Sequence, residues 1–174
     1  MVARGDLGVE VPIEALPNIQ RRIVAACARV GRRVIVATHL LESMIENPIP
    51  TRAEVTDVAN AVYEEVDAVM LSGETSVGRH PVRCVETLSR IARASEDHPG
   101  LALTRALQRS DTKQHLAVSA VELAESLDAA GILVITRKGV MADYVTNAHP
   151  QRVPIFAFTN TSHVRRRLAL NRHL

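Results

Sequence analysis

Four short apolar runs, separated by stretches of helical pattern, are the feature of this sequence that most restricts its fold. The runs are rich in β-branched residues or Phe, as β-strands are, and they comprise residues 34–37, 68–71, 132–135 and 154–158. The gaps between them carry apolar residues at the spacing of amphipathic helices. An order of strand, helix, strand and helix requires a parallel sheet, so the predicted fold class is α/β.

The composition supports such a fold and excludes several classes of function. Hydrophobic residues make up 47% of the 174-residue chain, but the aromatic residues are only two Tyr and two Phe, so the core must be aliphatic. A net charge of +2 is too small to predict nucleic-acid binding. No run approaches the roughly 18 apolar residues of a membrane span, and the N-terminus lacks a signal-peptide pattern. The cytoplasm is therefore the expected location.

Two groups of reactive or charged residues are expected to be structural. Cys27 and Cys84 are far apart in the sequence and follow no metal-ligand spacing, which predicts two buried, reduced thiols. Arg165–Arg167 lies on a predicted helix with Leu168 and Leu170 on the opposite side, which predicts one solvated face.

Local signals mark where helices begin and end. Apolar spacing predicts a helix over residues 12–30 that stops at Gly31. Thr51 and Glu54 fit a capping box at the start of a helix through Val66. Further helices are predicted over residues 81–94, 112–129, 140–147 and 162–169.

A polar stretch divides the chain. The sequence Asp97-His98-Pro99-Gly100 interrupts the periodic pattern, so we place a domain boundary there, between residues 1–100 and residues 101–174. The second part has only two predicted strands, which is too few for a stable parallel sheet. We therefore expect this part to be incomplete.

The opening residues, MVARGDLG, are the first candidate for an active site. A short apolar strand end leads into Arg4-Gly5-Asp6 and then Gly8. The glycines leave backbone N–H groups uncovered beside one carboxylate, so a cation and an anionic ligand could meet there. A strand that delivers a catalytic loop normally lies inside a sheet, and we therefore expect Met1 to be an internal position of a longer protein.

Polar residues follow three of the predicted strands. Asp6 follows the first strand end, Thr38 and His39 follow residues 34–37, and Ser72-Gly73-Glu74-Thr75 follows residues 68–71. Each segment alone is weak evidence for a functional site, because Thr after a strand often caps a helix and Gly-Glu-Thr often forms a turn. Ligands of parallel α/β proteins bind at the carboxyl ends of strands, so the three together predict one functional face.

Four segments closely resemble consecutive motifs of pyruvate kinase, in the same order and at similar separations. They are MVARGDLGVEVP at 1–12, VATHLLESMI at 36–45, PTRAEVTDVANAV at 50–62 and VMLSGETSVGRHP at 69–81. Residues 115–174 resemble the first half of the same family's C-terminal domain, with weaker motifs at Ile132–Arg137 and at PIFAFT, residues 154–159. The resemblance therefore covers nearly the whole chain.

The resemblance implies a fold, an activity and cofactors. Residues 1–100 would be part of a TIM (β/α)8 barrel, from the end of strand 6 to helix 8, and residues 101–174 part of an α/β C-terminal domain with parallel strands. Enzymes of this family transfer a phosphoryl group between phosphoenolpyruvate and ADP, which gives pyruvate and ATP in the last step of glycolysis. They use Mg²⁺ or Mn²⁺, usually with K⁺, and they assemble as homotetramers.

The resemblance also implies where substrate and metal bind. Asp6 would ligate the divalent metal that bridges the substrate and the phosphoryl group. The backbone of Ala3, Arg4, Gly5 and Asp6, at a short helix start, would hold the substrate carboxylate through N–H groups. Thr38 would line the substrate pocket beside the reacting enolate.

Further catalytic parts are implied on this chain and upstream of it. Ser72, Thr38 and Glu74 are the implied catalytic residues, and Ser72 and Glu74 would belong to a polar network that delivers a proton to the enol carbon. The family's second metal ligand and the lysine that neutralises the phosphoryl group lie in a Lys-x-Glu segment before residue 1. The residues for nucleotide and K⁺, and the domain that caps the active site, lie upstream as well.

Two positions depart from the family pattern. His39 stands where the family commonly has Gln, which places a titratable ring beside the predicted site. Relatives regulated by sugar phosphates bind phosphate at a hydroxyl-rich loop, but here that loop reads Thr136-Arg137-Lys138-Gly139-Val140-Met141 and has lost most hydroxyls. Activation by fructose bisphosphate is therefore not expected, although Arg137 and Lys138 could attract an anion.

Three hypotheses follow. In the first, the chain is an incomplete pyruvate kinase that cannot catalyse the reaction alone, because a barrel cut open exposes strand edges and an apolar face. In the second, it is a non-catalytic module that binds a full-length kinase or forms oligomers. In the third, the barrel part belongs to another enolate-forming enzyme, such as an aldolase of the phosphoenolpyruvate/pyruvate superfamily.

Overall fold

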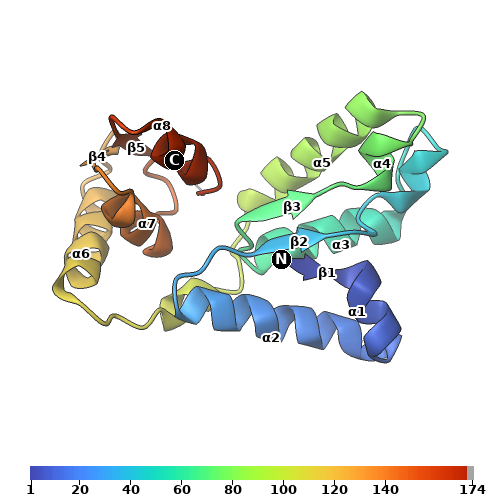
Figure 1. Cartoon of the computed structure of the whole chain (residues 1–174), viewed down its shortest axis with the longest axis horizontal. Coiled ribbons are helices and arrows are strands. Elements are labelled where there is room, and N and C mark those ends of the chain that lie inside the picture. The colour runs from blue at the N-terminus through green and yellow to red at the C-terminus, as the bar shows by residue number, and fades with distance from the viewer. Residues whose placement is uncertain (172–174) are drawn as a thin grey trace. The chain divides into compact units, whose positions relative to one another are not determined.

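The computed structural model describes residues 1–171, apart from the side chain of Thr104. Contacts group the residues into two compact units (Figure 1). The first comprises Met1–Ala26 and Val34–Leu103, and the second comprises Cys27–Arg33 and the chain from Thr104 onward. The second unit therefore includes a short segment that precedes most of the first unit in sequence.

The first unit is built on three parallel strands, β1 (Val2–Ala3), β2 (Ile35–Ala37) and β3 (Ala68–Met70), in the order β1-β2-β3 (Figure 1). Both pairs are parallel, which confirms the predicted sheet. The helices between and after the strands are α1 (Arg4–Glu10), α2 (Leu16–Arg29), α3 (Arg52–Tyr63), α4 (Gly73–Ser76) and α5 (Pro81–Glu96), with 3-10 turns at Ile13–Ala15 and Glu42–Ile45.

An aliphatic core fixes the segment that follows β2. Leu40 and Leu41 are fully buried and pack with Met44, Val58 and Cys84. Burying each leucine contributes about 2 kcal/mol, so this cluster holds the chain in place directly after Thr38 and His39. The core of this segment is therefore aliphatic, as the scarcity of aromatic residues predicts. The prediction for the cysteines is right for Cys84, but Cys27 is only half-buried.

The capping box that begins α3 is present. Glu54 N donates to Thr51 Oγ1 at 3.3 Å, and Thr51 N donates to Glu54 Oε2 at 2.7 Å. Burial raises the pKa of Glu54, but hydrogen bonds from Ser43 and Thr51 lower it by more, so its net pKa is below its usual value. The carboxylate therefore joins the start of α3 to the loop after β2, because Ser43 N also donates to it at 2.6 Å.

Some helix boundaries differ from the predicted ones. The helix expected over residues 12–30 begins as a 3-10 turn and becomes α-helical at Leu16. It ends before Gly31, which has a φ of 65°, a conformation that favours glycine. α3 ends at Tyr63 rather than Val66, because Glu65 takes a φ of 61° and the chain turns toward β3.

Up to residue 171, the second unit has two parallel strands and three helices that lie wholly within it. The strands β4 (Ile132–Ile135) and β5 (Ile155–Phe158) pair in parallel, as the sequence predicts. The helices are α6 (Thr112–Ser126), α7 (Val140–Asn147) and α8 (Ser162–Leu168), with a 3-10 turn at Leu103–Ala106. The helices contribute to a core with one face of the strands, and the buried members are Ala117, Val121, Val134, Ala142, Val145, Ile155, Val164 and Leu168.

The opposite face of this sheet is apolar and exposed. Leu133 lies opposite Phe156, and Ile135 lies opposite Phe158, with exposed fractions between 51% and 81% among the four side chains. Parallel strands that are apolar on both faces are normally buried on both faces by other parts of a protein. The exposure agrees with the expectation that this part of the fold is incomplete.

The predicted solvated face of α8 is confirmed, but its predicted apolar side is only partly right. Arg165, Arg166 and Arg167 are all exposed, and Arg167 also pairs with Asp143 of α7 at 2.9 Å. Leu170 lies just beyond the helix and is 51% exposed, so it does not extend the buried side. The pattern of apolar spacing identified the helix and its buried residues but could not identify an ion pair to another helix.

One carboxylate of α6 holds the loop that leads into β5. Glu125 Oε1 accepts hydrogen bonds from the backbone N–H groups of Gln151, Arg152 and Val153 at 2.8, 2.9 and 3.1 Å. Burial raises the pKa of Glu125. These three donors and the Arg152 guanidinium together lower the pKa by more than burial raises it, so the net pKa lies below the ordinary 4.5. The charged form is therefore the form that stabilises the fold.

We expect Glu125→Gln to lower the free energy of unfolding of the second unit by about 1 to 2 kcal/mol at neutral pH, because three donors lose a charged acceptor. A group with a lowered folded pKa stabilises above its unfolded pKa, here near 4.5, and loses that contribution as the pH falls through the folded value. The difference between the parent chain and the variant should therefore shrink below pH 4.5. Urea unfolding across this pH range measures the difference in stability.

Glu122→Gln, an exposed position on the same helix, is the control and should leave stability unchanged. A difference between the parent chain and Glu125→Gln that does not depend on pH would contradict the role given to the charged Glu125.

Among residues 1–171 the structure has no helix with the length and apolar character needed to span a membrane.

Candidate active site

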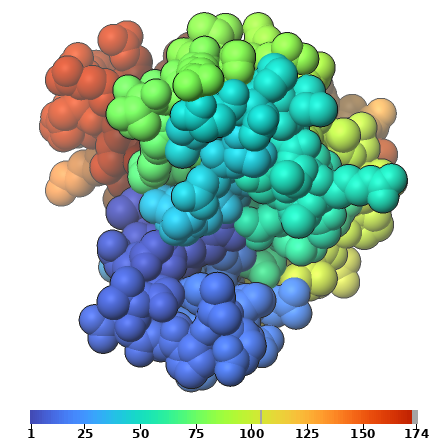
Figure 2. Space-filling view, turned by 90° about the vertical axis from the view of Figure 1, so that its right-hand side faces the viewer, coloured from blue at the N-terminus to red at the C-terminus, as the bar shows by residue number. Residues whose placement is uncertain are grey.

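The three predicted polar segments lie at one edge of the first sheet. Ala3, Ala37 and Met70 occupy one row of the strand register, and each stands at the carboxyl end of its strand. Figure 2 faces this edge and shows α1 in blue, the segment after β2 in cyan and the segment after β3 in green, next to one another. Asp6 and Thr38 therefore belong to neighbouring segments, as the sequence order predicts.

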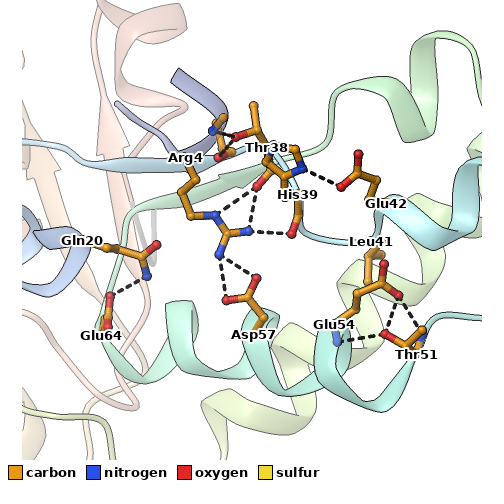
Figure 3. A network of polar contacts seen from close by, with 12 residues as sticks. Arg4, Gln20, Thr38, His39, Leu41, Glu42, Thr51, Glu54, Asp57 and Glu64 are labelled. Carbon is orange, nitrogen blue, oxygen red and sulfur yellow. Dashed lines mark hydrogen bonds and ion pairs between the residues drawn. The ribbon is translucent and has the colours of Figure 1, made fainter. Parts of the chain in front are cut away.

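Arg4 is the centre of the polar network at this edge (Figure 3). Its Nη1 donates to both carboxylate oxygens of Asp57 on α3, at 2.7 and 2.6 Å. Its Nε and Nη2 donate to the carbonyl of Thr38 at 3.0 and 2.7 Å, and Nη2 also donates to the carbonyl of His39 at 2.8 Å. One side chain, only 12% exposed, thus ties α1 to α3 and to the end of β2.

The residues that Arg4 holds have an unusual backbone conformation. Thr38 and His39 have φ angles of 68° and 53°, in the left-handed region that non-glycine residues rarely occupy. Such a conformation costs free energy and persists when surrounding contacts fix it. The Arg4 guanidinium supplies those contacts, because it binds the carbonyl groups of both residues.

The Thr38 hydroxyl points at the first turn of α1. Gly5 N donates to Thr38 Oγ1 at 2.9 Å, and the hydroxyl donates to the carbonyl of Ala37 at 2.6 Å. Thr38 therefore lies against the backbone that the resemblance assigns to the substrate carboxylate. A ligand carboxylate here would meet the N–H groups of α1 and the Thr38 hydroxyl together.

His39 packs on the same turn. Its Nδ1 lies 2.5 Å from Glu42 Oε2, and a Cβ atom added to Gly5 would lie 3.1 Å from its Nε2. A side chain at position 5 would push against this ring, so glycine allows the close approach. The His39 ring is thus oriented by Glu42 and borders α1.

Glu74 faces inward rather than into an open site. It is 2% exposed, and its two carboxylate oxygens accept from Leu41 N at 3.1 Å and Ser72 N at 2.8 Å. It therefore joins the segments after β2 and β3. Burial raises the pKa of Cys84, and the charge of Glu74 raises it further. Ser72, which precedes α4, is half-buried at the same edge.

A hollow of about 680 Å³ lies beside this network. One wall is apolar and comes from α1, α2 and the turn between them, including Val9, Ile13 and Leu16. The other wall is polar and includes Arg4, Asp57 and the buried pair Gln20 and Glu64, whose Nε2 and Oε2 atoms are 2.9 Å apart. Val9 and Ile13 are 85% and 78% exposed.

Sequence reasoning missed the partners that hold the site. The sequence does not point to Asp57 or Glu42. An Asp on the polar side of a helix and a Glu after a strand are common, and their spacing does not indicate a tertiary partner. The only pointer to Asp57 is its place in the segment PTRAEVTDVANAV, whose helical period puts it on α3. Its pairing with Arg4, 53 positions earlier, depends on the tertiary fold.

Comparison with known proteins decides the family. Residues 1–85 match the family model described as pyruvate kinase, barrel domain, and residues 114–174 match the one described as pyruvate kinase, alpha/beta domain. The chain belongs to the pyruvate kinase family. Most of the first unit thus falls in the barrel match, and most of the second unit falls in the α/β match, although Cys27–Arg33 of the second unit belong to the barrel match. Both agree with the predicted fold class.

Individual relatives give the same result. Pyruvate kinase of Corynebacterium glutamicum is 46% identical over 170 residues, covering 98% of this chain and 35% of that protein. Pyruvate kinase of Thermotoga maritima is 43% identical over 172 residues, covering 99% and 37%. A pyruvate kinase structure from Cryptosporidium parvum has a TM-score of 0.94 and 38% identity, covering 99% of this chain and 36% of that one. The chain spans a little over a third of the length of these pyruvate kinases.

The pyruvate kinase family is generally metal-dependent, and one residue here has the chemistry of a metal ligand. Asp6 is exposed in the first turn of α1 and offers the hard carboxylate oxygens that Mg²⁺ prefers. Within residues 1–171 no group of three or more His, Cys, Asp or Glu side chains could hold a metal ion. Asp6 is therefore suited to be one ligand among others that come from substrate, water or other segments of a pyruvate kinase.

Proposed function

We propose that this chain carries part of the active site of a pyruvate kinase, which transfers a phosphoryl group from phosphoenolpyruvate to ADP and forms pyruvate and ATP. The observation that supports the proposal is that the segments holding Asp6, Thr38 and Ser72 follow the carboxyl ends of three adjacent parallel strands. This is the edge at which parallel α/β enzymes bind their ligands.

Each residue has a role in the proposal. Asp6 would hold Mg²⁺ or Mn²⁺, and the metal would offset the negative charge of the phosphoryl group. The backbone N–H groups of Ala3, Arg4, Gly5 and Asp6 and the Thr38 hydroxyl would orient the substrate carboxylate.

Proton delivery to the enol carbon falls to the segment after β3. Ser72 contributes a hydroxyl to the proton path. Glu74 acts by positioning, because both of its carboxylate oxygens bind backbone N–H groups of Leu41 and Ser72. Residues for K⁺, for the nucleotide and for the remaining metal ligands lie in parts of the enzyme that precede this chain.

We expect the chain by itself not to catalyse this phosphoryl transfer. In the described residues β1 and β3 form the two edges of a three-stranded sheet, whereas a barrel leaves no edge unpaired. The chain thus lacks strands that a closed barrel needs, and we expect catalysis to depend on them. Residues 1–100 form the barrel portion in this proposal, residues 101–174 form the α/β portion, and the location is the cytoplasm.

The test is an exchange enzyme, defined as C. glutamicum pyruvate kinase in which the 170 aligned residues are replaced by those of this chain. We expect the exchange enzyme to form ATP from phosphoenolpyruvate and ADP in the presence of Mg²⁺ and K⁺, within about tenfold of the parent kcat, since the exchanged segments are 46% identical. The 174-residue chain alone should form none.

A folded, oligomeric exchange enzyme without activity would contradict the proposal. Circular dichroism and sedimentation separate this result from simple misfolding. Activity with a different enolate substrate, in place of phosphoenolpyruvate and ADP, would favour the hypothesis of another enolate-forming enzyme.

A second candidate function is assembly, and the hollow beside α1 favours it. An apolar wall with Val9 and Ile13 exposed is the kind of surface that a protein partner covers. The proposed occupant is another pyruvate kinase subunit, which gives a homo-oligomer. Sedimentation of the chain with and without C. glutamicum pyruvate kinase tests it, and Val9→Lys should abolish any association that uses this surface.

A further inference from the structure

The proposed chemistry uses the backbone of Arg4 but gives its side chain no role. That side chain lies against Thr38, a residue that the proposed chemistry does use (Figure 3). Arg4 Nε and Nη2 donate to the Thr38 carbonyl at 3.0 and 2.7 Å, and the N–H of the next residue, Gly5, donates to the Thr38 hydroxyl oxygen at 2.9 Å. Two consecutive residues of α1 therefore hold Thr38 at both ends, one by its carbonyl and one by its hydroxyl.

The bond to the carbonyl controls the backbone conformation of Thr38. With a φ of 68°, Thr38 lies in the left-handed region, which β-branched residues strongly disfavour. A return of this residue to an ordinary conformation would turn its carbonyl away from the Arg4 guanidinium. The same rotation would move the side chain, because the carbonyl carbon and Cβ are bonded to one Cα atom. The position of the Thr38 hydroxyl therefore depends on the hydrogen bonds that the guanidinium makes.

Asp57 fixes the guanidinium in turn. Both of its carboxylate oxygens accept from Arg4 Nη1, at 2.7 and 2.6 Å, and the Arg4 side chain is only 12% exposed. A planar guanidinium can bind a carboxylate along one side and two carbonyl groups along another, at fixed angles. The smaller ammonium group of a lysine cannot bridge the same acceptors in this way. The arrangement thus requires arginine at position 4.

We propose that the side chain of Arg4 is a positioning residue for the phosphoryl-transfer reaction, because it holds the Thr38 hydroxyl against the first turn of α1. The inference rests on the proposed function, which places the substrate beside Thr38. Arg4 acts through Thr38 and does not touch the substrate with its guanidinium, whose donors are engaged by Asp57 and by the carbonyls of Thr38 and His39.

Kinetics of the exchange enzyme test the role in catalysis. We expect Arg4→Met to lower kcat/KM for phosphoenolpyruvate about tenfold, because a misplaced group no longer orients the substrate. The Mg²⁺ concentration for half-maximal activity should stay unchanged, since Asp6 is intact. Arg4→Lys should lie between the parent and Arg4→Met, because an ammonium group can replace some of the donors. Val24→Ala is the control for lost stability and should keep the parent kcat/KM, since Val24 is buried on α2 and does not line the hollow beside α1.

Hydrogen exchange of the 174-residue chain, followed by NMR, tests the hold on Thr38 without any activity. The N–H of Gly5 is protected by the Thr38 hydroxyl, so its exchange rate reports whether that hydroxyl stays in place. We expect Arg4→Ala to raise this rate about tenfold, as a local opening does, and Val24→Ala to leave it unchanged.

Added guanidinium should reverse the effect in Arg4→Ala. The space vacated by the side chain opens into the hollow of about 680 Å³, which Arg4 and Asp57 both line, so a free guanidinium ion can reach the same acceptors. Millimolar guanidinium chloride should therefore slow the exchange of the Gly5 N–H again. Methylammonium chloride at the same concentration has the same charge without the planar fork and should not slow it.

The outcomes separate this inference from the proposed function. Unchanged Gly5 exchange in Arg4→Ala would overturn the inference, whatever the activity of the exchange enzyme. Parent-like kcat/KM in Arg4→Met, or an equal loss in Val24→Ala, would overturn the role in catalysis. Faster Gly5 exchange together with a folded exchange enzyme that is inactive even with Arg4 in place would support the hold of Arg4 on Thr38 and overturn the proposed function.

Discussion

Replacing Asp6 with Asn in the exchange enzyme is expected to lower kcat/KM for phosphoenolpyruvate about 100-fold or more. The substitution keeps the size of the side chain and removes the charged ligand that the proposal assigns to the metal. A bound divalent cation contributes several kcal/mol to a phosphoryl-transfer transition state, and a 100-fold loss is about 2.7 kcal/mol. Steady-state kinetics at a series of Mg²⁺ concentrations measures the effect.

The Mg²⁺ series distinguishes a metal ligand from a structural residue. Loss of a ligand should raise the Mg²⁺ concentration needed for half-maximal activity, whereas a merely destabilised variant would keep the parent's Mg²⁺ dependence at reduced activity. Glu10→Gln is the matched control, since Glu10 is exposed on the same short helix and has no proposed role. Wild-type activity and Mg²⁺ dependence in Asp6→Asn would show that the metal assignment is wrong.

The second large effect is expected at Arg4. Arg4→Met keeps much of the aliphatic stem but removes the donors that bind Asp57 and the carbonyls of Thr38 and His39. Breaking a buried pair usually costs 3 kcal/mol or more, but the Asp57 side chain is 36% exposed, so solvent screening reduces the loss. We expect the first unit to lose about 2 kcal/mol of stability in urea unfolding of the 174-residue chain.

Arg79→Met is the control for Arg4→Met. Arg79 pairs with Glu46 at 3.0 Å, but the two side chains are 71% and 61% exposed. A pair this exposed contributes less than about 1 kcal/mol. Equal losses in the two variants would mean that Arg4 acts as an ordinary surface charge. An unchanged m-value in both would confirm that the shift reflects stability rather than a change in the unfolded state.

Local signals predicted most of the elements. The bounds of α7 agree with the prediction to the residue, and Thr51 with Glu54 forms the capping box read from the sequence. Both signals act over a few positions, so no knowledge of the tertiary fold is needed to read them. The meeting of Asp6 and Thr38 at one sheet edge was predictable for a related reason, because parallel strands place their carboxyl ends together.

The contacts that hold the site were not predictable. The pairing of Arg4 with Asp57 joins α1 to α3, and nothing in either segment encodes the other. The backbone partners of Glu74 are a second case, because the binding of its oxygens to the N–H groups of Leu41 and Ser72 depends on the packing of the segment after β2. The left-handed conformation of Thr38 is a further case, since residue type disfavours it and tertiary hydrogen bonds impose it.

Because the chain passes between its two units more than once, recombination within the gene can separate residues that belong to the same unit. The chain passes from one unit to the other after Ala26, after Arg33 and after Leu103. A recombination event near residue 103 would transfer the second unit without Arg33, and would leave Asn147 and Asn171 facing a foreign residue. A shuffled gene therefore keeps these contacts of the second unit, the hydrogen bonds from Arg33 to Asn147 and Asn171, only if residues 27–33 travel with it.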